Sequence, residues 1–440
     1  MIDSSPVNIV SYRCPLRAGS YDLFELSTGG LVGGIAALSE KRSLRWFCFD
    51  SERGRLDYRN ITVYKTGITK ELNRSYYQVF CNTYLWPLFH YIRNINTYHE
   101  EPWNAYVAAN NAIADTIISN VNNETPILVN DYHLALLPSI LRNRGMSNIS
   151  FFWHVPWITP EFLKIIPWYR EMVSGILGAS KIGFHTEIYS KNFRSIIDEM
   201  YREGLLSDYE TTERKIVSVP LGIDYDSYSK RNIRKNFFEE ELKKVRRKGI
   251  KIISALSRLD YTKGIIQTLE AFRLFLKSNP GYAEKVVLVL AVSPSREEIE
   301  QYKNFKQEVD REVGKINSSL RTIEWTPVLY IYRKFNQSEV ASLYRNSDLF
   351  LVTPLMDGLN IVAEEYIAMN DTGFLIISEF AGISTYIKGF IEINPFDTKR
   401  YSDSIKMALD IDPSERLKIM REAKEVVKRL SIENWLRKMV

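Results

Sequence analysis

Two cations directly follow a buried strand in the second half of this sequence. The segment ALSRLDYTKG at 255–264 carries Arg258 and Lys263, and Gly264 then opens a helix. Cations beside a helix N-terminus suit a diphosphate group. When a nucleotide leaves, its phosphate gains negative charge, so fixed cations stabilise the transition state more than the ground state. We predict that Arg258 and Lys263 hold the diphosphate of a nucleotide sugar without a metal ion; ordinary surface ion pairs are the alternative for this segment alone.

A second candidate motif, TPLMDGLNIVAEEY at 353–366, also follows an apolar strand. The Gly-Leu-Asn after Asp357 is typical of a loop that enters a helix, whose first amides can bind a phosphate or sugar oxygen. Glu365, about two helical turns further along, can accept hydrogen bonds from ribose hydroxyls. Asp357 can accept them from hexose hydroxyls. Acidic helix starts are usually only caps, but the glycine-containing spacing favours a binding site.

Candidates for binding a second, phosphorylated substrate lie mainly in the first half. Arg13 follows the predicted first strand NIVSY, and a guanidinium fork suits phosphate oxygens. Arg296, in SPSRE after another apolar run, is the second candidate cation for that phosphate. The segment STGGLVGG at 27–34 would let backbone approach a ligand closely, although glycine pairs are also common in turns.

Aromatic and polar residues at further strand ends complete the candidate set. Tyr77 and Trp86 lie in YYQVFCNTYLWPLFHY at 76–91, and Asp131 and His154 each come just after a strand. A single histidine is more often structural than catalytic. The recurrence of these residues in one layer of strand ends favours a functional role.

Parallel sheets must position these residues. Apolar runs alternate with segments of helical period, which is typical of sheets covered on both faces. The predicted strands are 126–130, 150–155, 181–184, 251–256, 285–292 and 348–353, and the predicted helices of the first half are 133–145, 160–176 and 187–199. Ligands of open α/β sheets bind at the carboxyl ends of strands. We therefore expect two Rossmann-like domains whose sheets face an interdomain cleft.

The length of 440 residues is that of two domains. The break is expected after VPLGID at 219–224, where Pro and Gly precede a charged helix. The expected limits are 1–224 for an acceptor domain, 225–420 for a nucleotide-sugar donor domain, and 421–440 for a C-terminal helix that returns to the first domain.

Composition excludes several classes of protein. The net charge of +5 comes without a basic stripe, so we expect no nucleic-acid partner. No apolar run approaches the roughly 18 residues of a membrane span. Cys14, Cys48 and Cys81 lack metal-like spacing and are odd in number, so we expect no disulfide framework and a cytoplasmic location. The sequence lacks HExxH, CxxC, GxSxG and a Walker-type loop, so we expect no metal or cofactor. A homo-oligomer is compatible with this composition.

Taken together, the motifs resemble those of the trehalose-6-phosphate synthase family, in order and over nearly the whole chain. The matching segments are GGLVGG, YY…LWPLFHY, NDYHL, FFWHVPW, GFHTE, VPLGID, SRLDYTKG, SPSRE and TPLMDGLNIVAEEY. The resemblance implies a GT-B glycosyltransferase that is metal-independent and retains the anomeric configuration. It implies UDP-glucose or a similar donor, glucose 6-phosphate as acceptor, and trehalose 6-phosphate as product.

The resemblance also implies roles for single residues. The acceptor-site positions of the family fall on Arg13, Tyr77, Trp86, Asp131 and Arg296, and His154 matches the histidine beside the reacting centre. The family has no clear protein nucleophile; attack occurs on the front face, and the leaving phosphate helps to take the acceptor's proton. The donor-site positions fall on Gly30, Arg258, Lys263, Phe335, Leu359, Asn360, Ile361, Val362 and Glu365, with Asp357 on the transferred glucose.

Several positions near the expected acceptor depart from the family pattern. Tyr12 replaces Asn, Phe49 replaces Trp, Asn130 replaces His, Met356 replaces Arg, and 156–158 reads PWI instead of PFP. These changes leave open a related acceptor such as glycerol 3-phosphate, which would give glucosylglycerol phosphate. An inactive paralogue that binds sugar phosphates and regulates a partner is the alternative from another class.

Overall fold

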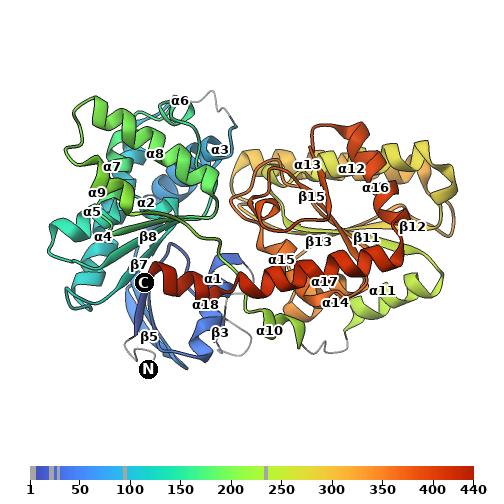
Figure 1. Cartoon of the computed structure of the whole chain (residues 1–440), viewed down its shortest axis with the longest axis horizontal. Coiled ribbons are helices and arrows are strands. Elements are labelled where there is room, and N and C mark those ends of the chain that lie inside the picture. Colours follow the sequence, from blue (N-terminus) through green and yellow to red (C-terminus); the bar gives the residue numbers. More distant parts are fainter. Residues whose placement is uncertain (1–5, 19–23, 27–29, 93–96, 232–235) are drawn as a thin grey trace. The chain divides into compact units, whose positions relative to one another are not determined.

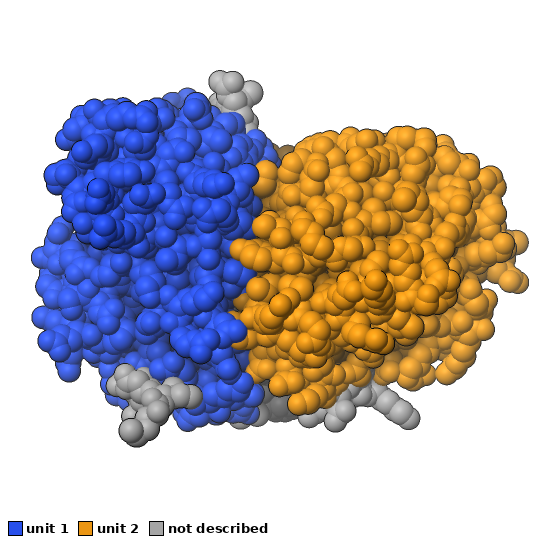
Figure 2. Space-filling model, viewed as in Figure 1, with its two compact units in different colours: residues 1–221, 432–440 blue, residues 222–431 orange. Residues whose placement is uncertain are grey.

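The chain forms two compact units in the computed structural model, which describes residues 6–18, 24–26, 30–92, 97–231 and 236–440 (Figures 1 and 2). Unit 1 comprises Met1–Leu221 and Ile432–Val440, and unit 2 comprises Gly222–Ser431. The expected limits at 224 and 420 differ from these. Ile223 forms a β-bridge with Ser431, and a helix fills 413–429, so both segments belong to unit 2.

The core of unit 1 is a sheet in the order β10-β9-β8-β7-β1-β4-β6-β5. All of its strand pairs are parallel except the hairpin of β5 and β6. Its strands are β1 (Val7–Val10), β4 (Leu44–Asp50), β5 (Gly54–Tyr58), β6 (Ile61–Gly67), β7 (Ile127–Asn130), β8 (Ile149–Trp153), β9 (Lys181–Phe184) and β10 (Ile216–Ser218). A separate antiparallel pair joins β2 (Leu16–Ala18) and β3 (Phe24–Leu26).

Helices of unit 1 connect these strands, as the alternation of patterns predicted. They are α1 (Gly30–Ala37), α2 (Lys70–Asn73), the π-helix η3 (Arg74–Leu85), α3 (Trp86–Phe89), α4 (Glu100–Ile118), α5 (Leu137–Asn143), α6 (Pro160–Leu163), α7 (Tyr169–Leu177), α8 (Glu187–Arg202) and α9 (Tyr209–Arg214), with short 3₁₀ turns η2 (Leu38–Glu40) and η4 (Tyr132–Leu134). The single helix predicted over 160–176 is wrong. Pro167, which has no N–H to donate, lies in the break between α6 and α7.

Unit 2 contains a fully parallel sheet in the order β13-β12-β11-β14-β15-β16. Its strands are β11 (Lys251–Arg258), β12 (Val286–Ser293), β13 (Val328–Tyr332), β14 (Leu349–Val352), β15 (Phe374–Ser378) and β16 (Ile391–Ile393). The side chains of β12, β14 and β15 are buried almost throughout, because helices cover both faces of the sheet (Figure 1). The predicted class of two parallel-sheet α/β domains is confirmed.

The helices of unit 2 form two layers (Figure 1). One layer contains α12 (Ile265–Ser278), α13 (Glu300–Leu320) and α16 (Thr398–Asp410). The other contains α11 (Phe237–Arg247), α14 (Gln337–Asn346), α15 (Ile361–Met369) and α17 (Pro413–Arg429), and α10 (Tyr225–Ser229) packs on α15. Three 3₁₀ turns complete the unit: η5 (Tyr261–Lys263), η6 (Pro280–Tyr282) and η7 (Gly382–Thr385). None of the helices in the described ranges is both long and apolar enough to cross a membrane.

The last helix of the chain, α18 (Ile432–Met439), packs on β8 and β9 of unit 1. Its Trp435 is buried with its ring edge-on to Phe152, at 5.2 Å between ring centroids. A Cβ on Gly183 would lie 2.7 Å from the sulfur of Met439. The bare backbone of β9 therefore lets α18 approach the sheet closely.

Candidate functional site

The loop from β11 to α12 in unit 2 has a conformation that brings Lys263 to the carboxyl edge of the sheet. Asp260 caps the short η5 turn by accepting from Thr262 N at 3.1 Å and Thr262 Oγ1 at 2.9 Å. Gly264 then adopts φ 69°, and a Cβ there would lie 2.0 Å from Thr353 O. Only glycine fits this left-handed position against the end of β14. The prediction that Gly264 opens a helix is confirmed.

Lys263 meets the acidic motif predicted from the loop after β14. Its Nζ lies 2.6 Å from Asp357 Oδ2, and Asn360 Nδ2 donates to the same oxygen at 3.0 Å. Both members of the ion pair are largely buried, with side chains 14% and 16% exposed. A backbone bond from Leu355 N to Thr262 O, at 2.8 Å, joins the two loops. A cation, a carboxylate and an amide thus converge at one edge of the sheet.

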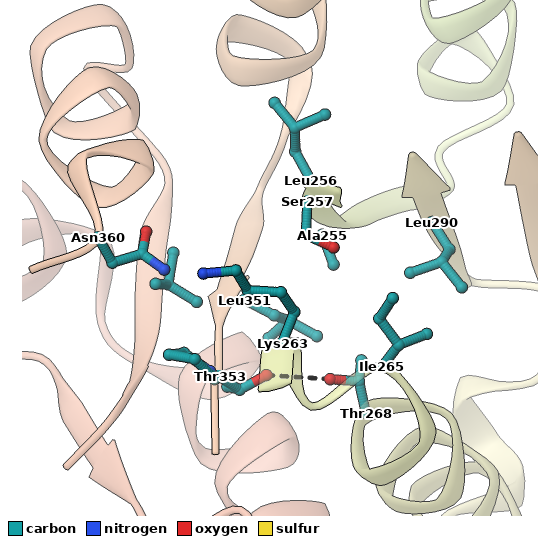
Figure 3. A pocket seen from close by; sticks show the side chains of 12 residues that line it. Ala255, Leu256, Ser257, Lys263, Ile265, Thr268, Leu290, Leu351, Thr353 and Asn360 are labelled. Atoms are coloured by element: carbon teal, nitrogen blue, oxygen red, sulfur yellow. Dashed lines mark hydrogen bonds between the residues drawn. The ribbon is translucent and has the colours of Figure 1, made fainter. Parts of the chain in front are cut away.

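A small cavity opens beside this cluster, between the ends of β11 and β14 and the start of α12 (Figure 3). Lys263 and Asn360 line it, and the amine of Lys263 points toward Asn360. Thr268 and Thr353 close its floor with a hydroxyl–hydroxyl bond of 3.0 Å. The cavity therefore offers polar groups at the place where open α/β sheets bind ligands.

The start of α15 supplies backbone amides near the same cluster. Asn360 precedes the helix with φ 79°, and the helix begins at Ile361. The first amides of a helix have no partner within it and can bind an anion. Leu359 is buried, and Ile361 and Val362 are half-buried. The four donor positions predicted at 359–362 thus form the entry to this helix.

Glu365 lies one turn into α15 and is only 6% exposed. Tyr228 Oη donates to its Oε1 at 2.8 Å, and Tyr344 Oη donates to its Oε2 at 2.7 Å. Burial raises the pKa of the Glu365 carboxyl, against the effect of these hydrogen bonds and of Arg231. A carboxylate has about four lone-pair positions, so two remain for ligand hydroxyls. The sequence does not predict either tyrosine, since they come from α10 and α14 and form no motif with Glu365.

The neighbouring Glu364 is fully buried, and its carboxylate oxygens have no hydrogen-bond partner among the described residues. Burial, and then the charge of Glu365, raise the pKa of Glu364 well above its usual value. A neutral Glu364 leaves Glu365 as the ionised member of the pair, because two adjacent buried carboxylates do not both ionise readily.

The remaining predicted residues of unit 2 lie in different surroundings. Arg258 ends β11 and is half-buried, and Phe335 follows β13 with the guanidinium of Arg333 at 4.6 Å from its ring centroid. Arg296 is turned inward: its side chain is 5% exposed and its Nη1 lies 3.0 Å from Asp260 Oδ2. In this conformation Arg296 is held by a buried carboxylate rather than presented to a phosphate in solvent.

Three neighbouring strands of unit 1 end at one edge and carry predicted residues. Arg13 comes after β1, Asp131 after β7 and His154 after β8, and the sheet order places these strands side by side. Asp131 has φ 77°, and its Oδ1 accepts from Tyr132 N at 3.0 Å and His154 N at 3.3 Å. The structure therefore brings Asp131 and His154 together, as their strand-end positions predicted.

Hydrogen bonds around Asn130 define the protonation state of His154. Asn130 Nδ2 donates to Val10 O at 3.2 Å and Leu128 O at 3.0 Å, so its Oδ1 must accept from His154 Nε2 at 3.0 Å. Burial, and then the nearby His185, lower the pKa of His154 well below its usual value. His154 is therefore a neutral imidazole with its proton on Nε2 and its lone pair on Nδ1. In the sequence, Asn130 is distinguished only by its departure from the family pattern.

The acceptor-side aromatic residues divide into two groups. Arg13 Nη2 donates to Tyr77 Oη at 3.1 Å, and the ring of Tyr12 stacks on Tyr77 at 3.9 Å. Trp86 is buried at the start of α3, with its ring 4.1 Å from that of His90. Gly30 begins α1, so the second glycine pair of 27–34 is helical rather than a turn, while 27–29 lie outside the described residues.

One expectation from the cysteines is wrong. Cys14 and Cys48 form a disulfide, with Cα atoms 5.1 Å apart. Their separation of 34 residues gave no signal, but β1 and β4 are adjacent parallel strands, so the segment after β1 passes beside β4. Across the part of the chain that the structure describes, no group of three or more His, Cys, Asp or Glu side chains is arranged to hold a metal ion.

Comparisons with known proteins give a consistent picture. The model of "Glycosyltransferase family 20" matches residues 27–440. The UDP-forming α,α-trehalose-phosphate synthase of Candida albicans is 34% identical, over 93% of this chain and 91% of its own length. That of Schizosaccharomyces pombe is 33% identical, over 93% of this chain and 84% of its own.

Solved structures agree along almost the full length. A UDP-forming α,α-trehalose-phosphate synthase from Burkholderia xenovorans, in complex with glucose-6-phosphate, is 25% identical with a TM-score of 0.90, covering 99% of this chain and 100% of that one. An E. coli structure with bound UDP-2-fluoro glucose is 26% identical with a TM-score of 0.88, covering 98% of this chain and 97% of that one.

Proposed function

The chain belongs to glycosyltransferase family 20, and we propose that it transfers glucose from UDP-glucose to glucose 6-phosphate, giving trehalose 6-phosphate and UDP. The observation that carries this proposal is the cluster of Lys263, Asp357 and Asn360 at the start of a helix, in a chain whose relatives are UDP-forming trehalose-phosphate synthases. The substrates bound in the similar structures, glucose-6-phosphate and a UDP-glucose analogue, agree with it.

The donor site is formed by residues of unit 2. Lys263 and Arg258 bind the diphosphate, and Glu365 accepts from the ribose hydroxyls. Asp357 accepts from hydroxyls of the transferred glucose. Phe335 and the entry to α15, comprising Leu359, Asn360, Ile361 and Val362, contact the rest of the nucleotide sugar.

The acceptor site is formed by residues of unit 1: Arg13 and Asp131 follow strands, whereas Tyr77 lies in η3 and Trp86 begins α3. Arg13 and Tyr77 bind the phosphate, since they lie together and Arg13 is exposed. Asp131 and Trp86 contact the sugar. Arg296 is paired with the buried carboxylate of Asp260, and its role on the acceptor's phosphate stays a prediction.

The reaction breaks the bond between the anomeric carbon and the diphosphate oxygen. Lys263 and Arg258 offset the charge that grows on the departing UDP, which is the largest contribution that fixed residues make to such a step. The acceptor hydroxyl attacks from the same face, so the configuration is retained, and the leaving phosphate takes its proton. His154, neutral and protonated on Nε2, keeps its Nδ1 as an acceptor for a sugar hydroxyl.

A matrix of donors and acceptors tests this proposal. UDP-, ADP- and GDP-glucose are each combined with glucose 6-phosphate and with glycerol 3-phosphate, and the products are identified by mass spectrometry and NMR. We expect α,α-linked trehalose 6-phosphate from UDP-glucose. If glucosylglycerol phosphate is the main product, the acceptor is glycerol 3-phosphate and not glucose 6-phosphate. If calorimetry shows donor binding but no acceptor gives turnover, the chain is an inactive paralogue.

We further propose that turnover needs no metal ion and acts on small molecules alone. The positive charge of Lys263 and Arg258 supports the absence of a metal ion from the reaction. Full activity after treatment with a chelator is expected. Loss of activity that added Mg²⁺ or Mn²⁺ restores would contradict it.

A further inference from the structure

The disulfide joins the segment after β1 to β4 immediately beside Arg13. Cys14 follows Arg13 in the chain and is half-buried, whereas Cys48 lies inside β4 and is 0% exposed. Arg13 itself is exposed. A covalent anchor to a buried strand thus lies next to an exposed cation of the acceptor site.

Backbone bonds to β4 hold the residues that precede Arg13. Ser11 N donates to Phe47 O at 3.1 Å, and Phe49 N donates to Tyr12 O at 3.2 Å. The hydroxyl of Ser11 donates to Arg13 O at 2.8 Å. The disulfide attaches the next residue, Cys14, to β4 as well. Arg13 therefore lies between two points at which the chain is attached to β4.

The side chains around Arg13 show what this anchoring achieves. Arg13 Nη2 donates to Tyr77 Oη at 3.1 Å, on an element 64 residues away. Tyr77 in turn stacks on Tyr12, with ring planes 4° apart, and the hydroxyl of Tyr12 donates to Asn73 Oδ1 at 2.7 Å. The position of Tyr12 therefore sets the position of Tyr77, and Arg13 must stay in register to reach the Tyr77 hydroxyl.

We propose that the Cys14–Cys48 disulfide is a positioning element for the acceptor, which holds the Arg13 guanidinium beside Tyr77 so that both meet the acceptor's phosphate. This inference rests on the proposed function, in which Arg13 and Tyr77 bind that phosphate. An arginine held in its binding geometry loses less conformational freedom on binding. Opening the disulfide therefore weakens acceptor binding and leaves the donor site in unit 2 intact.

The disulfide is open to exchange with a dithiol. A thiolate of the dithiol attacks the sulfur of Cys14, which is the less buried residue of the pair, the bond to Cys48 breaks, and Cys48 leaves as a thiolate that takes a proton. The second thiol of the reagent then displaces Cys14 and closes a disulfide in the reagent. Two electrons and two protons pass to the protein, and acceptor affinity follows the thiol–disulfide state of the surroundings.

The test compares steady-state kinetics of the oxidised protein with those of the protein reduced by dithiothreitol. Thiol titration of the denatured chain under each condition is expected to give one thiol and then three, since the chain has 3 cysteines. We expect reduction to raise the KM for glucose 6-phosphate about tenfold, with little change in kcat or in the KM for UDP-glucose. Cys14→Ser is expected to match the reduced protein and to ignore dithiothreitol, and the control Cys81→Ala is expected to respond as the wild type does.

Two results would overturn the inference. One is an equal acceptor KM in protein proven to be oxidised and reduced. The other is three thiols in protein treated with oxidised glutathione. If Cys14→Ser does not fold, the comparison of acceptor KM in oxidised and reduced wild type is the test. Circular dichroism then shows that the reduced protein is still folded. Absence of trehalose 6-phosphate from the oxidised wild type would instead reject the proposed function.

Discussion

At the scale of the residue, the ion pair of Lys263 and Asp357 is the chemical centre of unit 2. Without ligand, the lysine is held by the Asp357 carboxylate at 2.6 Å. With the donor bound, it is proposed to contact the diphosphate. Asp357 keeps the lysine near the cavity, and Asn360 shares the same carboxylate oxygen. The charge is thus in place before the donor arrives, which reduces the reorganisation needed at the transition state.

Replacing Lys263 tests this role. Lys263→Ala removes the charge that offsets the departing UDP, so we expect kcat/KM to fall by an amount equivalent to roughly 2–4 kcal/mol. Lys263→Arg keeps the charge with a different shape and is expected to recover part of the loss. Both are measured at saturating acceptor, with thermal unfolding as a control. Turnover of Lys263→Ala close to that of the wild type would exclude a role on the leaving group.

The buried Glu365 gives a second test through pH. Its pKa is raised by burial, so the ionised form that accepts from ribose is lost as pH falls through this raised pKa. We expect the KM for UDP-glucose to rise as the pH falls below this pKa. The Glu365→Gln variant is expected to have a high KM that does not rise further at acid pH. Stability moves the other way: the folded chain holds the proton more tightly than the unfolded chain, so stability falls as pH rises from the usual carboxyl pKa through the raised one. If the KM of Glu365→Gln for UDP-glucose still rises at acid pH, Glu365 is not the group that binds ribose.

At the scale of the element, the junction of β11 with α12 determines where the site forms. Asp260 closes η5, and Gly264 lets α12 start directly against the end of β14. Arg258 ends β11 and Lys263 ends η5, so this junction positions both cations. A change in this backbone is therefore expected to alter donor binding without any change in a charged group.

Gly264→Ala tests the junction. The new Cβ would meet Thr353 O at 2.0 Å, in a backbone conformation with φ 69°. We expect a loss of roughly 1–3 kcal/mol of stability and a weaker affinity for UDP-glucose by calorimetry. Gly281→Ala, where a Cβ would have nothing within 4 Å, is the matched control and is expected to change neither. Equal behaviour of the two variants would show that the left-handed turn is not required.

At the scale of the whole molecule, the chain passes through unit 1, then unit 2, and ends in unit 1 with α18. The disulfide lies entirely within unit 1, and its two cysteines are 34 residues apart in the sequence. Because a cross-link mainly restricts the unfolded chain, its effect on stability should be confined to the unit that contains it.

Double replacement of Cys14 and Cys48 by Ser tests this expectation. We expect a loss of about 2–4 kcal/mol from the unfolding free energy of unit 1, with that of unit 2 unchanged. Chemical denaturation followed by hydrogen exchange separates the two units, and Cys81→Ala is the control for loss of a cysteine. An equal loss in both units would show that they unfold as one cooperative body.

The sequence alone determined the class of fold and the location of most candidates. Continuous apolar runs predicted parallel strands because a strand covered on both faces has no polar side. Residues directly after those runs, such as Arg13, Asp131, His154 and Lys263, could be predicted as site residues, since parallel strands end at a common edge. The family motifs added the substrate to that pattern.

Only the tertiary structure decided which side chains meet across elements. Tyr344 and Tyr228 reach Glu365 from other helices, Arg296 turns inward to Asp260, and Cys14 bonds to Cys48. Spacing along the chain carries no information on such pairs, because their approach depends on strand order and helix packing. The site residues at strand ends could be predicted from a local pattern of apolar runs. The groups that hydrogen-bond, pair with or cross-link those residues depend on the packing of the folded chain.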